Sequence, residues 1–386
     1  MKKIKLMNKI AACGTDLFDR REYEVSDTVE HPDAILVRSA DLHGMPVDPA
    51  LLAVARAGAG VNNIPKDELA KAGVVVFNTP GANANGVKEL AVAALLLASR
   101  DIVGGIGWAD TLAGEPDVAA AVEAGKSKFS GKEIYGKTLG VIGLGAIGGM
   151  VANVARSLGM NVIGYDPYLT VHAAWSISSA VRNAQSADEL YAAADYISLH
   201  VPATGSTRGM INRETLSKMK DGVRVINLSR ADLVVTGDMK AALSAGKVAA
   251  YVTDFPTAET LRVPNIINIP HLGASTEESE DNCAVMAAEE LMDYLVTGNI
   301  RNSVNYPAVS LPYTGAVRIC LCHRNIANTL SSITSIVSGA GINIENLSNG
   351  SMGEFAYTMV EIGVAVPEEI LPALRKIPGM IRVRVI

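Results

Sequence analysis

The sequence predicts an α/β fold with two doubly wound parallel-sheet domains, followed by a small ferredoxin-like module. Short apolar runs alternate with helical patterns along residues 1–270, which is typical of parallel strands joined by helices. The hydrophobic fraction is 49% and the aromatic fraction only 5%, which favours the aliphatic core of buried parallel strands. Residues 315–386 show the order strand, helix, strand, strand, helix, strand.

The predicted strands are the apolar runs between these helical patterns. They lie at residues 34–37, 74–77, 139–142, 162–165, 196–200, 224–228, 249–253 and 265–269. Residues 88–103 are expected to form one long apolar helix. Residues 304–315 contain two prolines, a glycine and no helical period, so they predict a linker before the last module.

Composition excludes several classes of protein. The net charge is −6, which argues against a nucleic-acid or acidic-membrane partner. Cys13, Cys283, Cys320 and Cys322 are too scattered for a disulfide framework, which favours a reducing, cytoplasmic location. Cys320 and Cys322 are expected on one face of a strand, in the core, so no metal site is predicted. No apolar run has the length of a membrane span.

Residues 137–148, KTLGVIGLGAIG, combine an apolar run with a glycine-rich turn of the form G-x-G-x-x-G. Gly143 makes the tight turn, Gly145 lets the backbone approach a pyrophosphate, and Gly148 lets the following helix pack closely. Asp166 ends the next predicted strand, where a carboxylate accepts hydrogen bonds from ribose hydroxyls and repels a 2′-phosphate. The pattern predicts binding of NAD rather than NADP; the alternative is an ordinary glycine turn in a parallel sheet.

Polar residues that suit hydride transfer follow other predicted strands. His271 is a candidate base for a hydroxyl proton, and Arg230 is a candidate cation for an adjacent carboxylate. A carboxylate behind the histidine would fix its tautomer, and Asp254 and Glu259 are the candidates. The alternatives are a histidine that caps a helix and an arginine in a surface salt bridge.

Several motifs resemble the D-2-hydroxyacid dehydrogenase family. They are VIGLGAIG, INLSRADLV, IPHLGAST, RAGAGVNNI and NTPGANANGVKEL. Within the family, the chain is most similar to members that oxidise D-3-phosphoglycerate to 3-phosphohydroxypyruvate, the first step of L-serine biosynthesis. The tail CHRNIANTLSSITSIVSGAGINIENL resembles an ACT regulatory domain.

The resemblance implies three domains. They are a discontinuous, flavodoxin-like substrate-binding domain (1–91 and 272–306), a Rossmann NAD-binding domain (92–271) and an ACT-like regulatory domain (315–386). The implied catalytic residues are Arg230, Glu259 and His271. The residues predicted to bind NAD are Gly143, Gly145, Ala146, Ile147, Gly148, Asp166, Pro202 and Asp254. The implied substrate contacts are Arg38, Ser39, Gly60 and Asn83, and the implied contacts of an L-serine effector are His323, Asn325 and Asn343.

The chain departs from the family pattern in places that leave alternatives open. Counting five residues from Asp254 gives Glu259 as the acid, whereas alignment on residues 255–257 places Ala258 there. Asn328 stands where the effector loop usually has glycine, so inhibition by serine is open. Lys126 and Lys128 are candidates for the substrate's phosphate, or part of a solvated face. Other readings are a hydroxypyruvate or glyoxylate reductase and a non-catalytic NAD sensor. A homodimer or homotetramer is expected.

Overall fold

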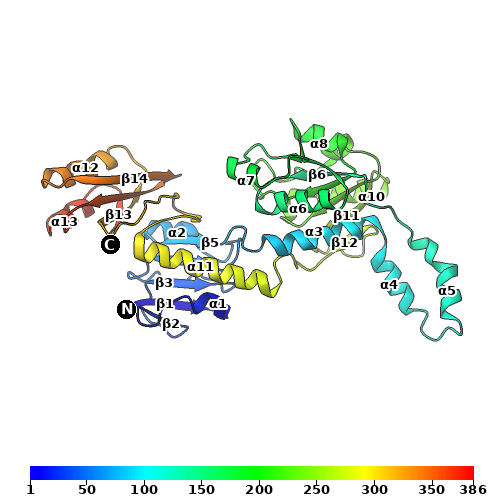
Figure 1. Cartoon of the computed structure of the whole chain (residues 1–386), viewed down its shortest axis with the longest axis horizontal. Coiled ribbons are helices and arrows are strands. Elements are labelled where there is room, and N and C mark those ends of the chain that lie inside the picture. Colours follow the sequence, from blue (N-terminus) through cyan, green and yellow to red (C-terminus); the bar gives the residue numbers. More distant parts are fainter. The chain divides into compact units, whose positions relative to one another are not determined.

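The computed structural model describes residues 1–386, and the chain divides into two compact units (Figure 1). Unit 1 contains Met1–Asn83 and Glu277–Ile386, and unit 2 contains Ala84–Thr276. All residues predicted to bind NAD or to act in catalysis fall in unit 2. All residues predicted to bind substrate or effector fall in unit 1.

Unit 1 is built on a five-stranded parallel sheet of order β2-β1-β3-β4-β5. This is the strand order of flavodoxin-like doubly wound sheets. Its strands are β1 (Lys2–Met7), β2 (Tyr23–Ser26), β3 (Ala34–Val37), β4 (Ala53–Arg56) and β5 (Val75–Asn78). The short helices of this region are α1 (Ala12–Thr15) and α2 (Lys66–Lys71).

Helix α11 (Glu277–Thr297), yellow in Figure 1, packs against the sheet of unit 1. Its buried face includes Ala284, Ala287 and Leu291, which share a core with residues of β3, β4 and β5. A Cβ atom on Gly14 of α1 would lie 2.5 Å from the backbone of Ala284, so only glycine permits this close approach of two helices.

The C-terminal part of unit 1 is a four-stranded antiparallel sheet of order β14-β15-β13-β16. Its elements are β13 (Val317–Arg324), α12 (Thr329–Gly339), β14 (Ile344–Met352), β15 (Phe355–Ile362), α13 (Ile370–Arg375) and β16 (Met380–Val385). This element order is the predicted one. Ile319 and Leu321 face the core beneath the two helices, whereas Cys320 and Cys322 point to the other face and join the core that contains α11. The two cysteines therefore share one face, as predicted.

Side chains of the C-terminal sheet donate hydrogen bonds to the carbonyl groups at the end of helix α11. The last carbonyl groups of a helix have no partner within it. Here Arg384 donates to the carbonyl oxygens of Tyr294 and Leu295, Arg318 donates to that of Thr297 at 2.7 Å, and Tyr357 donates to that of Gly298 at 2.8 Å. Cationic donors also suit the negative end of the helix dipole.

Unit 2 contains a seven-stranded parallel sheet of order β12-β11-β10-β9-β6-β7-β8. Counted from its first strand, the order is that of dinucleotide-binding sheets with one further strand at an edge. The strands are β6 (Thr138–Ile142), β7 (Asn161–Tyr165), β8 (Arg182–Asn183), β9 (Tyr196–Leu199), β10 (Val223–Asn227), β11 (Val248–Thr253) and β12 (Ile266–Asn268).

Helices cover both faces of this sheet. On one face, α3 (Ala84–Ser99) and α6 (Ala146–Ser157) pack on Leu139 and Val141. On the other, α8 (Ala187–Ala193), α9 (Arg213–Lys218) and α10 (Thr236–Ser244) pack on residues that include Ile197 and Val225. The alternation of side chains along each strand thus fills two separate aliphatic cores.

The single helix predicted over residues 88–103 is wrong at its end. Helix α3 stops at Ser99, and α4 (Ile102–Asp110) begins after Asp101, whose carboxylate accepts from the Gly104 N–H. An aspartate at this capping position starts a new helix. The helices α4 and α5 (Val118–Gly125) with the turn η1 (Lys126–Phe129) form an arm without buried residues, cyan in Figure 1.

The predicted strands are confirmed to within one residue at each end, whereas β1, β2, β4 and β8 were not predicted. The predicted linker at 304–315 has no helix or named strand but is packed. Tyr306 is buried and donates to the Ala70 carbonyl, and Asn305 accepts from the Val76 N–H. No single helix has the length and apolar composition to span a membrane, and only the bent pair α3 and α4 meets both criteria when taken together.

We expect Arg318→Ala to destabilise the chain by about 3–5 kcal/mol, because it leaves the buried Glu361 carboxylate without its cation, which lies at 2.7 Å. Urea unfolding measures this loss, and limited proteolysis should release the C-terminal segment earlier. Arg213→Ala, which removes an exposed arginine beside Asp238, is the control and should leave the unfolding curve unchanged. Equal curves for Arg318→Ala and the original chain would contradict this role of Arg318.

Candidate active site

The glycine turn follows β6 and leads into α6. Gly143 has a φ of +87°, and a Cβ atom there would lie 2.4 Å from the His200 carbonyl oxygen. A Cβ on Gly148 would lie 1.9 Å from the Gly143 carbonyl oxygen, so the helix packs directly on the turn. A Cβ on Gly145 would meet nothing within 4 Å. The turn therefore leaves open space at the start of α6, which fits the pyrophosphate of a dinucleotide.

Asp166 lies at the end of β7 and is bonded to the same turn. One carboxylate oxygen accepts from the Leu144 N–H, and the other accepts from the Tyr168 N–H, both at 2.9 Å. A carboxylate has about four acceptor positions, so it retains capacity for ribose hydroxyls. Ala146 and Ile147 form the first turn of α6, and Pro202 lies in the loop after β9.

Three polar residues come together at the ends of β10, β11 and β12. Arg230 follows β10, where buried Asn227 holds its loop by donating to the Arg230 carbonyl at 2.9 Å. His271 follows β12, and its backbone N–H donates to the backbone carbonyl of Asp254 at 3.1 Å. The Arg230 guanidinium has no ion pair and donates only to the Ser229 carbonyl, at 2.6 Å. The ring nitrogens of His271 have no hydrogen-bond partner, so both side chains retain hydrogen-bonding capacity for a ligand.

Asp254 is the buried acid of this group, with 1% of its surface exposed. Its Oδ1 atom has no hydrogen-bond partner. Burial raises the pKa of Asp254 above its ordinary value, and the charges of nearby His271 and Arg230 act in the opposite direction. Phe255 packs its ring against that of His271, with centroids 5.1 Å apart. Buried carboxyl groups near cations at strand ends are frequent in active sites.

Known proteins resemble this chain over most of its length. Residues 109–273 match the model of the D-isomer specific 2-hydroxyacid dehydrogenase NAD-binding domain. D-3-phosphoglycerate dehydrogenase of Synechocystis is 32% identical to the chain, over 97% of the chain and 69% of that protein. The enzyme of the same name from Bacillus subtilis is 33% identical over 83% of the chain and 60% of that protein. The chain belongs to the D-isomer specific 2-hydroxyacid dehydrogenases.

Solved structures show the same fold. The TT0316 protein of Thermus thermophilus has a TM-score of 0.63 and 25% identity, covering 78% of this chain and 99% of that one. An NAD-complexed D-isomer specific 2-hydroxyacid dehydrogenase of Lactobacillus delbrueckii has a TM-score of 0.64 and 23% identity, covering 79% of this chain and all of that one. The chain spans 58% to 69% of the length of the first curated relatives. The chain therefore contains the NAD-binding domain of this family.

Of the three predicted catalytic residues, Glu259 makes no contact with His271 through a hydrogen bond or ion pair. It lies exposed in a turn and makes no hydrogen bond or ion pair, whereas buried Asp254 is electrostatically coupled to His271. His200 is a residue that the sequence analysis did not single out. It lies against the glycine turn, with Nε2 2.8 Å from Ser198 Oγ and Nδ1 unpartnered. Burial lowers the pKa of His200 to about 4, so its ring is neutral at pH 7.

The predicted substrate residues of unit 1 lie at the ends of its strands. Arg38 follows β3 and forms an ion pair with Glu280 of α11, beside a pocket of about 370 Å³. The Ser39 N–H donates to Asn8 at 3.2 Å. A Cβ on Gly60 would have only the Arg56 guanidinium within 4 Å, and Asn83 is half-buried.

The two lysines proposed for the phosphate are engaged on the arm. Lys126 pairs with Glu123 at 2.5 Å, and the Lys128 ammonium lies 4.8 Å from the centre of the Trp108 ring.

The three predicted effector residues do not meet within one chain. His323 and Asn325 lie at one end of the C-terminal sheet, where His323 pairs with Ala356. Asn343 precedes β14 at the other end, beside the register of Ile344 with Ile362. The separation is about 20 Å at the usual rise of a strand. His323 is buried and bonded to Thr358, and Asn325 donates to the Gly353 carbonyl.

We expect Gly145→Val to keep the fold and to lose cofactor affinity. The new side chain has free space but fills the place where the pyrophosphate approaches the backbone. Titration of NADH fluorescence should show binding at least about tenfold weaker, at an unchanged melting temperature, because several charge-assisted hydrogen bonds are lost. Gly237→Ala, at another glycine with open space, is the control. Normal NADH binding by Gly145→Val would show that the pyrophosphate lies elsewhere.

Proposed function

We propose that the chain oxidises D-3-phosphoglycerate to 3-phosphohydroxypyruvate with NAD, the first step of L-serine biosynthesis. The observation that carries the proposal is the similarity to a D-3-phosphoglycerate dehydrogenase over 97% of the chain, together with the grouping of Arg230, His271 and Asp254. Bound NAD would supply the hydride acceptor. The cytoplasmic location remains a prediction. The four cysteines form no disulfide bond with one another, as is usual for proteins of a reducing compartment.

The chemistry follows from groups of this chain. A ring nitrogen of His271 accepts the hydroxyl proton as the general base. Arg230 binds the adjacent carboxylate and stabilises the negative charge that develops on the carbonyl oxygen. Asp254 places a buried carboxylate near the imidazolium that forms and stabilises it. In this scheme buried Asp254, and not the exposed Glu259, is the acid that acts on His271.

The domain roles follow the two units. We assign the flavodoxin-like part of unit 1 to the substrate, with Arg38, Ser39, Gly60 and Asn83 as contacts. Unit 2 holds NAD through Gly143, Gly145, Ala146, Ile147, Gly148, Asp166 and Pro202. Arg230, which has no ion pair, and His271 favour an enzyme over a non-catalytic NAD sensor. A glyoxylate or hydroxypyruvate reductase is the alternative enzyme.

The C-terminal sheet is proposed as an ACT-like regulatory domain. His323 and Asn325 lie far from Asn343 within one chain, so an L-serine site that uses all three would need two copies of the domain. The arm formed by α4, α5 and η1 is a separate reason to expect self-association. None of the residues of α4 and α5 is buried, and Ile102, Val103 and Ile106 of α4 and Val118 of α5 are exposed. A second copy of the chain is the proposed occupant of this apolar surface.

The activity is tested by NADH absorbance with NAD and D-3-phosphoglycerate. We expect turnover by the original chain and a fall in kcat/KM of about 10²–10⁴ in His271→Ala, because the general base is lost. His31→Ala is the control, since His31 is also an exposed histidine with a φ of +50° but lies in unit 1 beside Asp48. Suppression by added L-serine would support the regulatory role of the C-terminal sheet.

Each other outcome has a definite meaning. Turnover without suppression by serine would overturn the effector proposal and keep the enzyme. Full turnover by His271→Ala would overturn the mechanism. Turnover only with glyoxylate or hydroxypyruvate would favour the reductase, and tight NAD binding without any turnover would favour the sensor.

Self-association is tested by light scattering of the purified chain. We expect a multiple of the mass of one chain, and the mass of a single chain for Ile106→Lys, because a charge on the apolar surface of the arm opposes its burial. Leu158→Lys, at an exposed apolar residue outside the arm, should leave the mass unchanged. A single-chain mass for the original chain would remove the arm as an interface.

A further inference from the structure

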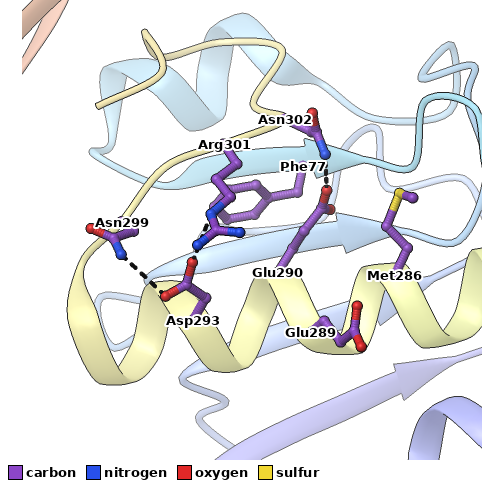
Figure 2. Close-up of a pocket in the computed structure, with 8 residues that line it drawn as sticks. All are labelled: Phe77, Met286, Glu289, Glu290, Asp293, Asn299, Arg301 and Asn302. Atoms are coloured by element: carbon purple, nitrogen blue, oxygen red, sulfur yellow. Dashed lines mark hydrogen bonds and ion pairs between the residues drawn. The ribbon is translucent and has the colours of Figure 1, made fainter. Parts of the chain in front are cut away.

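Glu290 is a buried acid in the middle of helix α11, away from the residues assigned to catalysis. It is 8% exposed, and its Oε2 atom has no hydrogen-bond partner. Its Oε1 atom accepts one hydrogen bond, from the Asn302 side chain at 2.6 Å. Figure 2 shows this pair between helix α11 and the strand that carries Phe77.

Glu290 lines a pocket of about 440 Å³ with other charged groups. Glu289 is exposed on the same helix, and Asp293 binds Arg301 at 3.2 Å and Asn299 at 3.3 Å (Figure 2). Arg301 is therefore already paired and does not neutralise Glu290. The pocket gives protons access to the neighbourhood of Glu290, while no cation compensates its charge.

A chain of hydrogen bonds runs from Glu290 toward the predicted substrate loop. Asn302 binds Glu290 through its side chain, and its backbone carbonyl accepts from the Asn78 N–H at 3.2 Å. The Asn78 side chain donates to the Ala59 carbonyl at 2.6 Å. Ala59 precedes Gly60, whose backbone is the predicted substrate contact. The neighbouring Thr79 N–H donates to the Gly58 carbonyl at 3.2 Å, so the segment 78–79 holds the loop at two points.

We propose that Glu290 is a positioning residue for substrate binding, which acts through Asn302 and Asn78 on the backbone loop at residues 58–60. The proposal rests on the proposed function, since the loop is assigned to the substrate there. Ionised Glu290 makes a charge-assisted hydrogen bond with Asn302, which is shorter and stronger than the bond to a neutral acid. The ionised form therefore holds the loop more firmly.

The charge of Glu290 changes near neutral pH. Burial raises the pKa of Glu290 to about 7, the Asn302 hydrogen bond opposes this shift, and the nearby charge of Glu289 adds to it. Below pH 7 the carboxyl is neutral and its bond to Asn302 is weak. Above pH 7 it is ionised and the bond is strong. Substrate affinity should therefore rise with pH through this range.

The experiment compares Glu290→Gln with the original chain at pH 6 and pH 8, using NAD and D-3-phosphoglycerate. Glutamine has the shape of the neutral acid and cannot ionise. At pH 6 we expect equal KM values. At pH 8 we expect a KM about fivefold higher for Glu290→Gln, the difference between a charge-assisted and a neutral hydrogen bond. The ratio of kcat values should be the same at both pH values, because the loop binds substrate and does not take part in hydride transfer.

Two further variants separate positioning from general effects. Glu289→Gln removes a charge one residue away, outside the hydrogen-bond chain, and should keep a KM ratio near one at pH 8, where Glu290 is ionised in both chains. At pH 6 its KM should not exceed that of the original chain, because loss of the Glu289 charge favours the ionised form of Glu290. Asn302→Ala should raise KM at pH 8, and adding Glu290→Gln to it should have no further effect, because both act on one chain of bonds. A KM ratio for Glu290→Gln that is equal at pH 6 and pH 8, or additive effects in the double variant, would overturn the proposal. Lack of turnover by the original chain would instead overturn the proposed function; calorimetric titration with D-3-phosphoglycerate at the two pH values would then test the positioning.

Discussion

Burial of helix α11 is the constraint on which the arrangement of unit 1 depends. One face of the helix fills the core between the parallel sheet and the antiparallel C-terminal sheet, and Tyr357 and Cys320 belong to the same core. The cost of burying the end of this helix is offset by donors from the C-terminal sheet, above all Arg318 and Arg384. The C-terminal sheet is therefore an integral part of unit 1.

The same helix reaches the predicted substrate residues from its other end. Glu280, in its first turns, pairs with Arg38, so under the proposed function a substrate anion competes with a carboxylate for this guanidinium. Both side chains are about 40% exposed, and ion pairs of this kind contribute only about 0–1 kcal/mol. Because the pair is weak, a bound anion can displace Glu280 from Arg38 at little cost. Along its length, α11 thus connects the C-terminal sheet, Glu290 and Arg38.

The sequence was sufficient for most of the parallel strands, though not for β1, β2, β4 and β8, and for the glycine turn, because these follow from local rules. Buried parallel strands must be apolar runs, and Gly143 and Gly148 occupy positions where any side chain would collide with backbone. The sequence was not sufficient where a single capping residue or a contact between distant segments determines the structure. The break of the long helix depends on a single cap at Asp101. The burial of Glu290 depends on the return of residues 299–303 across its helix, which no local pattern in α11 records.

Sequence spacing was also insufficient to choose between the two candidate acids for His271, Asp254 and Glu259. Counting along the chain favoured Glu259, because spacing says nothing about which side chain is buried. The fold places Glu259 in an exposed turn and Asp254 at the end of a buried strand, where water is excluded. An exposed carboxylate is screened by solvent, whereas the charge of a buried one acts strongly on a neighbouring imidazolium. The Oδ1 atom of Asp254 has no hydrogen-bond partner, and an unpartnered buried carboxylate oxygen of this kind is itself a feature that marks functional sites.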